Sequence, residues 1–91
     1  MRVRYKARAL RDFEAIHRHI SQFDAAAAKT VVRRIGHSIG RLEVLPMSGR
    51  PSVKGTRLLV VPRLPYVVIH RVGEDVVDII AVLHTARRRR T

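Results

Sequence analysis

The sequence predicts an α+β fold of order β-α-α-β-β-β, in which a small antiparallel sheet carries an N-terminal helical hairpin. Two helix-like apolar patterns occupy the first half of the chain and are separated by only one or two residues. Three apolar, β-rich runs separated by turn residues fill the last third. Helices joined by so short a connection form an antiparallel pair, and the strands that follow supply the sheet on which the pair packs.

The first element is a short strand, because Val3 and Tyr5 alternate with basic residues. From Ala7 the apolar residues recur at steps of four and three, which is the spacing of an amphipathic helix. The predicted buried stripe of this helix consists of Ala9, Phe13, Ile16, Ile20 and Phe23.

A second helix is expected from Asp24, whose carboxylate is a favourable N-cap, to Leu45-Pro46, where the proline ends it. Its apolar stripe consists of Ala28, Val32, Ile35, Ile39 and Leu42. Gly36 and Gly40 lie one turn apart within it, and each costs about 1 kcal/mol relative to alanine. They either allow the first helix or the sheet to approach closely or are tolerated irregularities, and the sequence leaves both readings open.

Three further strands are expected near residues 56–61, 66–72 and 76–83. Pro62 and Pro65 flank the first connection, and Gly73 begins the hairpin turn of the second. The last two strands are apolar on both faces over several residues. We therefore expect the helices to cover one face of the sheet and a partner outside this chain to cover part of the other.

The chain of 91 residues is expected to form one domain, residues 1–91, because a chain this short encloses a single core. It contains no cysteine, which excludes disulfide scaffolds and thiolate metal sites and suits a reducing compartment. No apolar run approaches the roughly 20 residues that span a bilayer, and no apolar signal-peptide segment follows the basic N-terminus. These features predict a soluble, cytoplasmic protein without a membrane partner.

The charge balance is the most unusual feature of the composition. Nineteen Lys and Arg residues against seven Asp and Glu give a formal net charge of +12, spread over both halves of the chain. Such a surface attracts nucleic acid, an acidic membrane surface or an acidic protein. A basic domain with no such partner remains the plainer alternative.

The candidate binding residues fall into two groups. Arg33, His37 and Arg41 are spaced by four along the second helix, with Lys29 and Arg34 beside them, and form either a contact surface for phosphates and acidic segments or a solvated helix face. The second group, from the turn region, the sheet and its end, consists of Arg50, Lys54, Arg57, Arg63, Arg71, Arg87, Arg88, Arg89 and Arg90. Residues of both groups that converge in the fold would bind a polyanion.

An ordered set of short sequence matches runs along nearly the whole chain. The set consists of Tyr5, Ala9-Leu10-x-Asp12-Phe13-x-x-Ile16, Leu42-x-x-Leu45-Pro46-x-x-Gly49-Arg50-Pro51, Gly55-Thr56-Arg57, Pro65-Tyr66 and Val82-Leu83-His84-x-Ala86-Arg87. In this order the matches resemble the toxins of the RelE/ParE family of type II toxin–antitoxin systems. Within that family, Leu64-Pro65-Tyr66 and His84-Thr85-Ala86-Arg87 look most like the ParE branch.

The ParE resemblance implies a toxin that binds DNA gyrase, stalls the cleaved DNA complex and blocks replication without chemistry of its own. It also implies a cognate antitoxin, whose acidic, amphipathic tail folds on docking, and a toxin–antitoxin hetero-oligomer that binds promoter DNA through the antitoxin. The segment Arg87 to Arg90 and the helical hairpin are the expected contacts with the target.

The family's mRNA-cleaving branch is the first alternative. The resemblance implies a cluster of cations with a tyrosine, or a histidine–tyrosine pair, near the C-terminus. The residues available for these roles are His84 as the acid and Arg57, Arg63, Arg71 and Arg87 as the cations. No tyrosine follows Leu83, and arginine is a poor base, so the sequence argues against RNA cleavage.

A non-toxic, basic nucleic-acid-binding module is the second alternative. The sequence favours a protein that is not an enzyme. If the protein is an enzyme, the expected activity is that of an endoribonuclease. His17 and His19 are two residues apart on a helix and point to different faces, so we expect neither a metal nor a cofactor.

Overall fold

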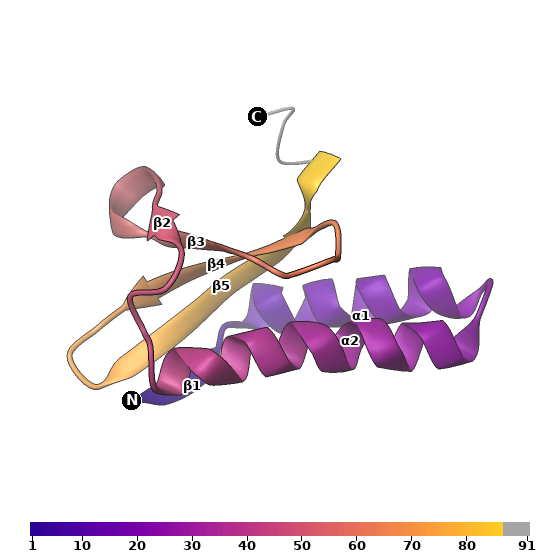
Figure 1. The fold of residues 1–91 in the computed structure, drawn as a ribbon, viewed down its shortest axis with the longest axis horizontal. Helices are drawn as coiled ribbons and strands as arrows, with labels where there is room; N and C mark the ends of the chain where they lie inside the picture. The colour runs from indigo at the N-terminus through magenta and orange to yellow at the C-terminus, as the bar shows by residue number, and fades with distance from the viewer. Residues whose placement is uncertain (87–91) are drawn as a thin grey trace.

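The computed structural model describes residues 1–86 and has an α+β fold. Two antiparallel helices lie along one face of a five-stranded sheet, whose strands are ordered β1-β5-β4-β3-β2 (Figure 1). The elements are β1 (Arg2–Tyr5), α1 (Ala7–Ser21), α2 (Ala25–Gly40), β2 (Arg50–Pro51), β3 (Arg57–Val60), β4 (Tyr66–Val72) and β5 (Val76–His84), with 3₁₀ turns at Arg41–Glu43 and Val53–Gly55. The predicted fold class and the helical hairpin are confirmed.

The sheet is mixed and not entirely antiparallel as the sequence predicted. β1 runs parallel to β5, with Arg2 opposite Val76 and Tyr5 opposite Ile79, while the other pairs are antiparallel. Parallel neighbours need a crossover, and the two helices supply part of one. The alternation of Val3 and Tyr5 identifies a strand but not its partner. A two-residue strand, β2, also joins the sheet beside β3.

The helical hairpin begins where the sequence predicts, but α2 stops short of its predicted end at Leu45-Pro46. The Asp24 carboxylate accepts a hydrogen bond from the Ala27 N–H at 3.0 Å, as expected of an N-cap. Helix α2 ends at Gly40, and the 3₁₀ turn carries the chain on toward Leu45. The buried stripe fails at Phe23, which is 78% exposed because α1 ends at Ser21 and Phe23 lies in the turn between the helices.

The core lies between the hairpin and the facing side of the sheet. Its residues include Ala9, Ile35, Ile39 and Leu42 from the helical half and Val61, Tyr66, Val68, Val77, Ile79 and Val82 from the sheet. Gly36 and Gly40 make no close approach, because no atom lies within 4 Å of the position that a Cβ would take at either residue. The close-approach reading of these glycines is therefore wrong.

The opposite face of the sheet is also apolar. Leu58, Val67 and Ala81 are buried there, whereas Ile69 is only partly buried and Val60, at the end of β3, is 58% exposed. Cover for this face from outside the chain stays a prediction. Within residues 1–86, neither helix is long and apolar enough to cross a membrane.

Candidate functional site

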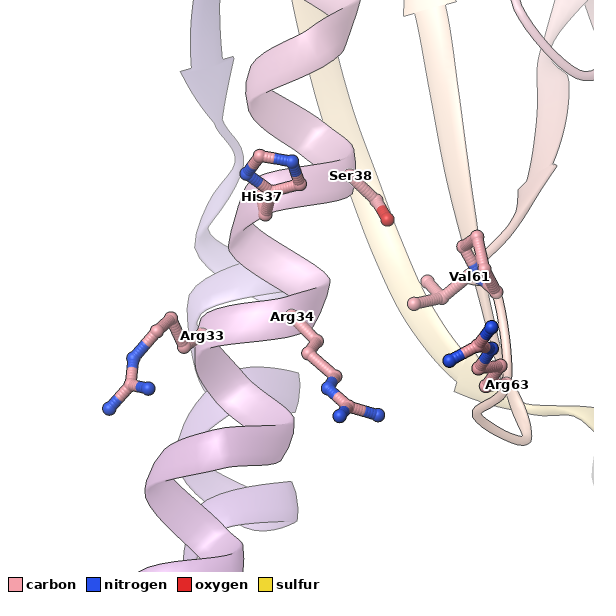
Figure 2. A pocket seen from close by; sticks show the side chains of 7 residues that line it. Arg33, Arg34, His37, Ser38, Val61 and Arg63 are labelled. Atoms are coloured by element: carbon pink, nitrogen blue, oxygen red, sulfur yellow. The ribbon is translucent and has the colours of Figure 1, made fainter.

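A basic cleft opens between α2 and the connection from β3 to β4. It has a volume of about 530 Å³ and is lined by Arg33, Arg34, His37, Ser38, Val61, Pro62 and Arg63. Figure 2 shows Arg34 and Arg63 on opposite walls and the Ser38 hydroxyl pointing across the cleft toward Val61, while Arg33 extends to the other side of α2. The cleft therefore brings together cationic groups from two segments about thirty residues apart in sequence.

The helical wall of the cleft follows from the periodicity of α2. Arg34 and Ser38 lie one turn apart and each precedes a fully buried isoleucine, Ile35 or Ile39. They thus sit at the border between the core and the solvent. Ser38 is only 8% exposed, while Arg34 is exposed.

The opposite wall is a tight connection between two prolines. Arg63 has a φ of 64°, in the left-handed region that costs a non-glycine residue roughly 1–2 kcal/mol. Two backbone hydrogen bonds close the connection, from the Val61 N–H to the Tyr66 carbonyl at 3.0 Å and from the Leu64 N–H to the Val61 carbonyl at 3.3 Å. Arg63 is therefore held in a defined backbone conformation at the mouth of the cleft.

The cleft carries uncompensated positive charge. No carboxylate lines it. Within residues 1–86, the two ion pairs lie elsewhere: Arg4 Nε is 2.7 Å from Asp78 Oδ1, and Arg8 Nε is 3.5 Å from Asp12 Oδ2. Positive groups that lack a protein anion favour binding of an external one.

A smaller cleft adjoins the basic cleft along the same groove. The residues that line it are Ser38, Arg41, Leu42, Ser48, Leu59, Val60 and Pro62, of which Ser38 and Pro62 are shared with the basic cleft. At this point the edge of β3 is only partly paired, because β2 faces Arg57 and Leu58 and stops there. The groove thus continues from the basic cleft into a smaller cleft of mixed polar and apolar lining, beside an open strand edge.

The other predicted arginines do not converge on the basic cleft. Arg57 donates hydrogen bonds to the carbonyls of Met47 at 2.8 Å and Gly49 at 3.1 Å, so its guanidinium holds the segment before β2. Arg71 donates to the carbonyl of Lys54 at 3.2 Å. Both side chains thus have a structural role.

Arg50 is exposed on β2, beside a surface hollow lined by Gly49, Leu58, Leu59 and Val60. Arg87 to Arg90 lie outside the described residues. Sequence reasoning placed Arg34 only beside the basic stripe and did not select Ser38, although their spacing of four next to the apolar stripe marks them as border residues of the helix.

A third cleft, of about 360 Å³, lies between α1 and the sheet. Its polar lining residues are Asp12, His19, Tyr66 and His84. Tyr66 pairs with His84 across β4 and β5, and the two rings meet edge to face with centroids 5.4 Å apart. A histidine–tyrosine pair therefore exists although no tyrosine follows Leu83, because the register of β4 and β5 brings Tyr66 to His84.

The chemistry available to this pair is restricted by its surroundings. Tyr66 is 8% exposed, and burial raises the pKa of its hydroxyl above its ordinary value. His84 Nδ1 accepts a hydrogen bond from the Ala86 N–H at 3.1 Å, which leaves Nε2 as the protonated nitrogen of the neutral ring. The raised pKa makes the Tyr66 hydroxyl a poorer base at neutral pH.

Metal ligation finds no support in the part of the chain that the structure describes. No group of three or more His, Asp or Glu side chains comes together there to hold an ion. The basic cleft offers cations rather than metal ligands. The arrangement favours anion binding over metal chemistry.

Comparison with known proteins identifies the family of the chain. Residues 3–89 match the family model described as the ParE toxin of the type II toxin–antitoxin system parDE. The chain is 42% identical over 84 residues to Y4kP of Sinorhizobium fredii, described as a candidate toxin, covering 91% of this chain and 86% of the relative. It is 37% identical over 81 residues to toxin RelE2 of Caulobacter vibrioides, covering 88% and 90% of the two chains.

A solved structure of the chromosomal ParDE toxin–antitoxin system from P. aeruginosa has the same fold. It superposes with a TM-score of 0.84 at 26% identity and covers 92% of this chain and 95% of its own. The family match spans more than half of the chain, and its relatives are matched over most of their length. The chain therefore belongs to the ParE/RelE family of toxins of type II toxin–antitoxin systems.

Proposed function

We propose that this toxin acts in the cytoplasm on DNA gyrase, stalls the cleaved DNA complex and so blocks replication. The observation that carries the proposal is the match of residues 3–89 to the ParE family, the branch for which the sequence resemblance implies this target. The described surface supports an inhibitor that acts by binding. Its basic cleft presents arginines, which stay protonated and bind anions but do not transfer protons readily.

A cognate antitoxin with an acidic, amphipathic tail is the proposed partner. The groove beside α2 supports it, since one end is cationic, the other has a mixed polar and apolar lining, and an open edge of β3 adjoins it. Large apolar side chains are also exposed just after the 3₁₀ turn Arg41–Glu43 that follows α2. Val44 is 80% exposed, Leu45 52% and Met47 60%. The hetero-oligomer would reach promoter DNA through the antitoxin.

Val60 provides a sharp test of this partner. Val60→Glu places a like charge against an acidic tail in the smaller cleft, beside the open edge of β3. Val53→Glu makes the same change at a residue 74% exposed in the separate 3₁₀ turn. We expect only the first variant to lose co-purification with the product of the neighbouring gene. Equal loss in both variants, or retention in both, would contradict the proposed docking surface.

RNA cleavage is the second candidate, because the structure places Tyr66 against His84 in a cleft that also contains His19. Two histidines and a tyrosine are groups that could act as acid and base on an RNA 2′-hydroxyl and leaving oxygen. The burial of Tyr66 and its raised pKa weigh against this reading.

The experiment that separates the two candidates is pulse-labelling of DNA and protein synthesis immediately after the toxin is induced without its antitoxin. We expect DNA synthesis to fail first and purified toxin to inhibit supercoiling by gyrase. If protein synthesis fell first, and the variants His84→Gln and Tyr66→Phe no longer inhibited it, the target would be messenger RNA and not gyrase. A non-toxic basic module predicts that neither synthesis falls.

A further inference from the structure

A row of basic residues runs along α2 beside the basic cleft, and Arg33 in this row extends away from the cleft (Figure 2). Lys29, Arg33, His37 and Arg41 follow one another at steps of four, so they share one side of α2 and its continuation. Each step advances by about 6 Å along a helix axis, which is of the same order as the separation of successive phosphates along a nucleic-acid strand. Arg34 and Arg63 face each other across the adjoining cleft (Figure 2).

We infer that this groove binds the phosphodiester backbone of nucleic acid directly, with Arg34 and Arg63 as the central contacts. This inference goes beyond the proposed function, since it requires neither gyrase nor an antitoxin; a nucleic acid in the basic cleft would compete there with the acidic part of the antitoxin tail. Guanidinium groups bind phosphate oxygens in a bidentate manner, and the Ser38 hydroxyl in the cleft is a further donor of the kind that contacts phosphates.

The composition of the cleft favours a phosphate backbone over an acidic peptide or exposed bases. Its only apolar lining side chains are Val61 and Pro62, too few to bury the apolar face of an amphipathic helix. It contains no phenylalanine, tyrosine or tryptophan on which a base would stack. The expected binding is therefore largely independent of sequence and strongly dependent on salt.

The conformation of Arg63 is a second, independent observation. A positive φ at a bulky residue between Pro62 and Pro65 fixes the backbone that carries this guanidinium. Less backbone freedom is then lost when a phosphate binds between Arg63 and Arg34. The cleft is preorganised on the sheet side and anchored by buried isoleucines on the helix side.

The test measures binding of the purified full-length chain to a fluorescent 20-base-pair DNA duplex by anisotropy, over a range of salt concentrations. The cleft variant combines Arg34→Gln with Arg63→Asn, because asparagine adopts the left-handed backbone region more readily than most residues. The control variant combines Arg11→Gln with Arg18→Gln, which removes the same charge from exposed positions on α1. Circular dichroism confirms that both variants remain folded.

We expect the cleft variant to bind about tenfold or more weakly at low salt and its log–log salt slope to fall by about 2, roughly one unit for each lost phosphate contact. The control should change affinity by no more than about threefold, and residual slope should come from the remaining cations. Equal losses in the two variants would show that net charge alone attracts DNA and would overturn the inference.

A labelled glutamate-rich peptide of matched charge distinguishes the two kinds of anion. We expect it to bind the unaltered protein more weakly than the duplex does. Tighter binding of the peptide, lost selectively in the cleft variant, would identify an acidic protein segment as the occupant and would also overturn the inference. If the cleft variant bound the duplex as tightly as the unaltered protein does, the inference would be overturned whatever the result with the peptide.

Discussion

The Asp12 carboxylate of α1 accepts a hydrogen bond from the backbone N–H of Val82 in β5 at 2.9 Å. β1 covers β5 only from Val76 to Ile79, and the last bond on that edge runs from the Lys6 N–H to the Ile79 carbonyl. Beyond this point the Val82 N–H would lack a strand partner. A side chain of α1 thus continues the hydrogen bonding where β1 ends. This role explains an aspartate on the inner face of an amphipathic helix.

Replacing Asp12 should destabilise the fold through the unsatisfied Val82 N–H. We expect Asp12→Ala to lower the free energy of unfolding by about 1–3 kcal/mol, the usual cost of a buried donor left without an acceptor. Asp12→Asn retains an acceptor oxygen and should cost less. Urea unfolding measures both values.

Glu14→Ala on the exposed side of the same helix is the control for Asp12, with an expected change within about 0.5 kcal/mol. If Asp12→Ala changed stability no more than this control, the hydrogen bond to Val82 would not contribute to the fold.

The glycines differ in what a methyl group would meet. Gly36 lies in α2 with no atom within 4 Å of its missing Cβ, so Gly36→Ala should raise the free energy of unfolding by about 0.5–1 kcal/mol. Gly49 has a φ of 84°, and its Cβ would lie far inside the contact distance of the Leu58 carbonyl. Gly49→Ala should therefore destabilise the protein.

Thermal unfolding of these two variants, followed by circular dichroism, gives the comparison directly. A lower melting temperature for Gly36→Ala would mean that α2 is packed more tightly in solution at this position. An unchanged melting temperature for Gly49→Ala would mean that the backbone around β2 can relax.

The sequence predicted the elements of the fold better than their arrangement. Apolar periodicity located both helices and four of the five strands, and Asp24 capped α2 as expected. Periodicity carries no information about pairing, so the parallel contact of β1 with β5 and the contact of Tyr66 with His84 both emerged only from strand register. β2 was missed because two residues do not form a pattern.

Charge patterning predicted the candidate site in part. Arg33 and Arg63 do line one cleft, and Arg41 lines the cleft next to it. A count of arginines cannot distinguish a free guanidinium from one that binds backbone carbonyls, as Arg57 and Arg71 do. Hydrogen bonds between segments far apart in sequence decide that question, and they depend on the folded geometry.

Substitution of Arg57 therefore tests whether this residue stabilises the fold or binds a partner. Its Nε is buried without an acceptor, while its terminal nitrogen holds the carbonyls of Met47 and Gly49. We expect Arg57→Ala to lower the free energy of unfolding by about 1.5–3 kcal/mol, because it removes hydrogen bonds made by a charged donor. Arg50→Ala, on the neighbouring strand, should change it by no more than about 0.5 kcal/mol.

The same two variants address the proposed contacts. If Arg57 bound the target, Arg57→Ala would lose toxicity while the protein kept its melting temperature. We expect the melting temperature to fall instead, with any loss of toxicity following the loss of folded protein measured in the same cells.

His70 should make the stability of the protein depend on pH. It is fully buried at the bulge between β4 and β5 and faces Arg57 across the strand pair. Burial, which is the largest cause, lowers the pKa of His70 below its ordinary value of 6.5, and the positive charge of Arg57 lowers it further. The carbonyls of Pro46 and Val68 lie near enough to oppose this shift, but neither forms a hydrogen bond of good geometry with the ring.

The folded protein therefore holds His70 neutral at pH values at which the unfolded chain binds a proton. The free energy of unfolding should be highest above about pH 6.5 and should fall as the pH decreases below that value toward the lower folded pKa. The pKa of Asp78 is also lowered, chiefly by its hydrogen bond from Arg4, but its effect is lost only below its ordinary value of 3.8. The two contributions occupy separate pH ranges.

Urea unfolding between pH 7.5 and 5 tests this prediction with two variants, in a range chosen around the ordinary histidine pKa of 6.5. His70→Leu removes the buried titratable ring, so it should flatten the decrease in stability. His37→Gln, at an exposed position on α2, should leave the decrease unchanged. If His70→Leu kept the full decrease while His37→Gln removed it, the pH dependence would come from the exposed cationic groove rather than from the buried ring.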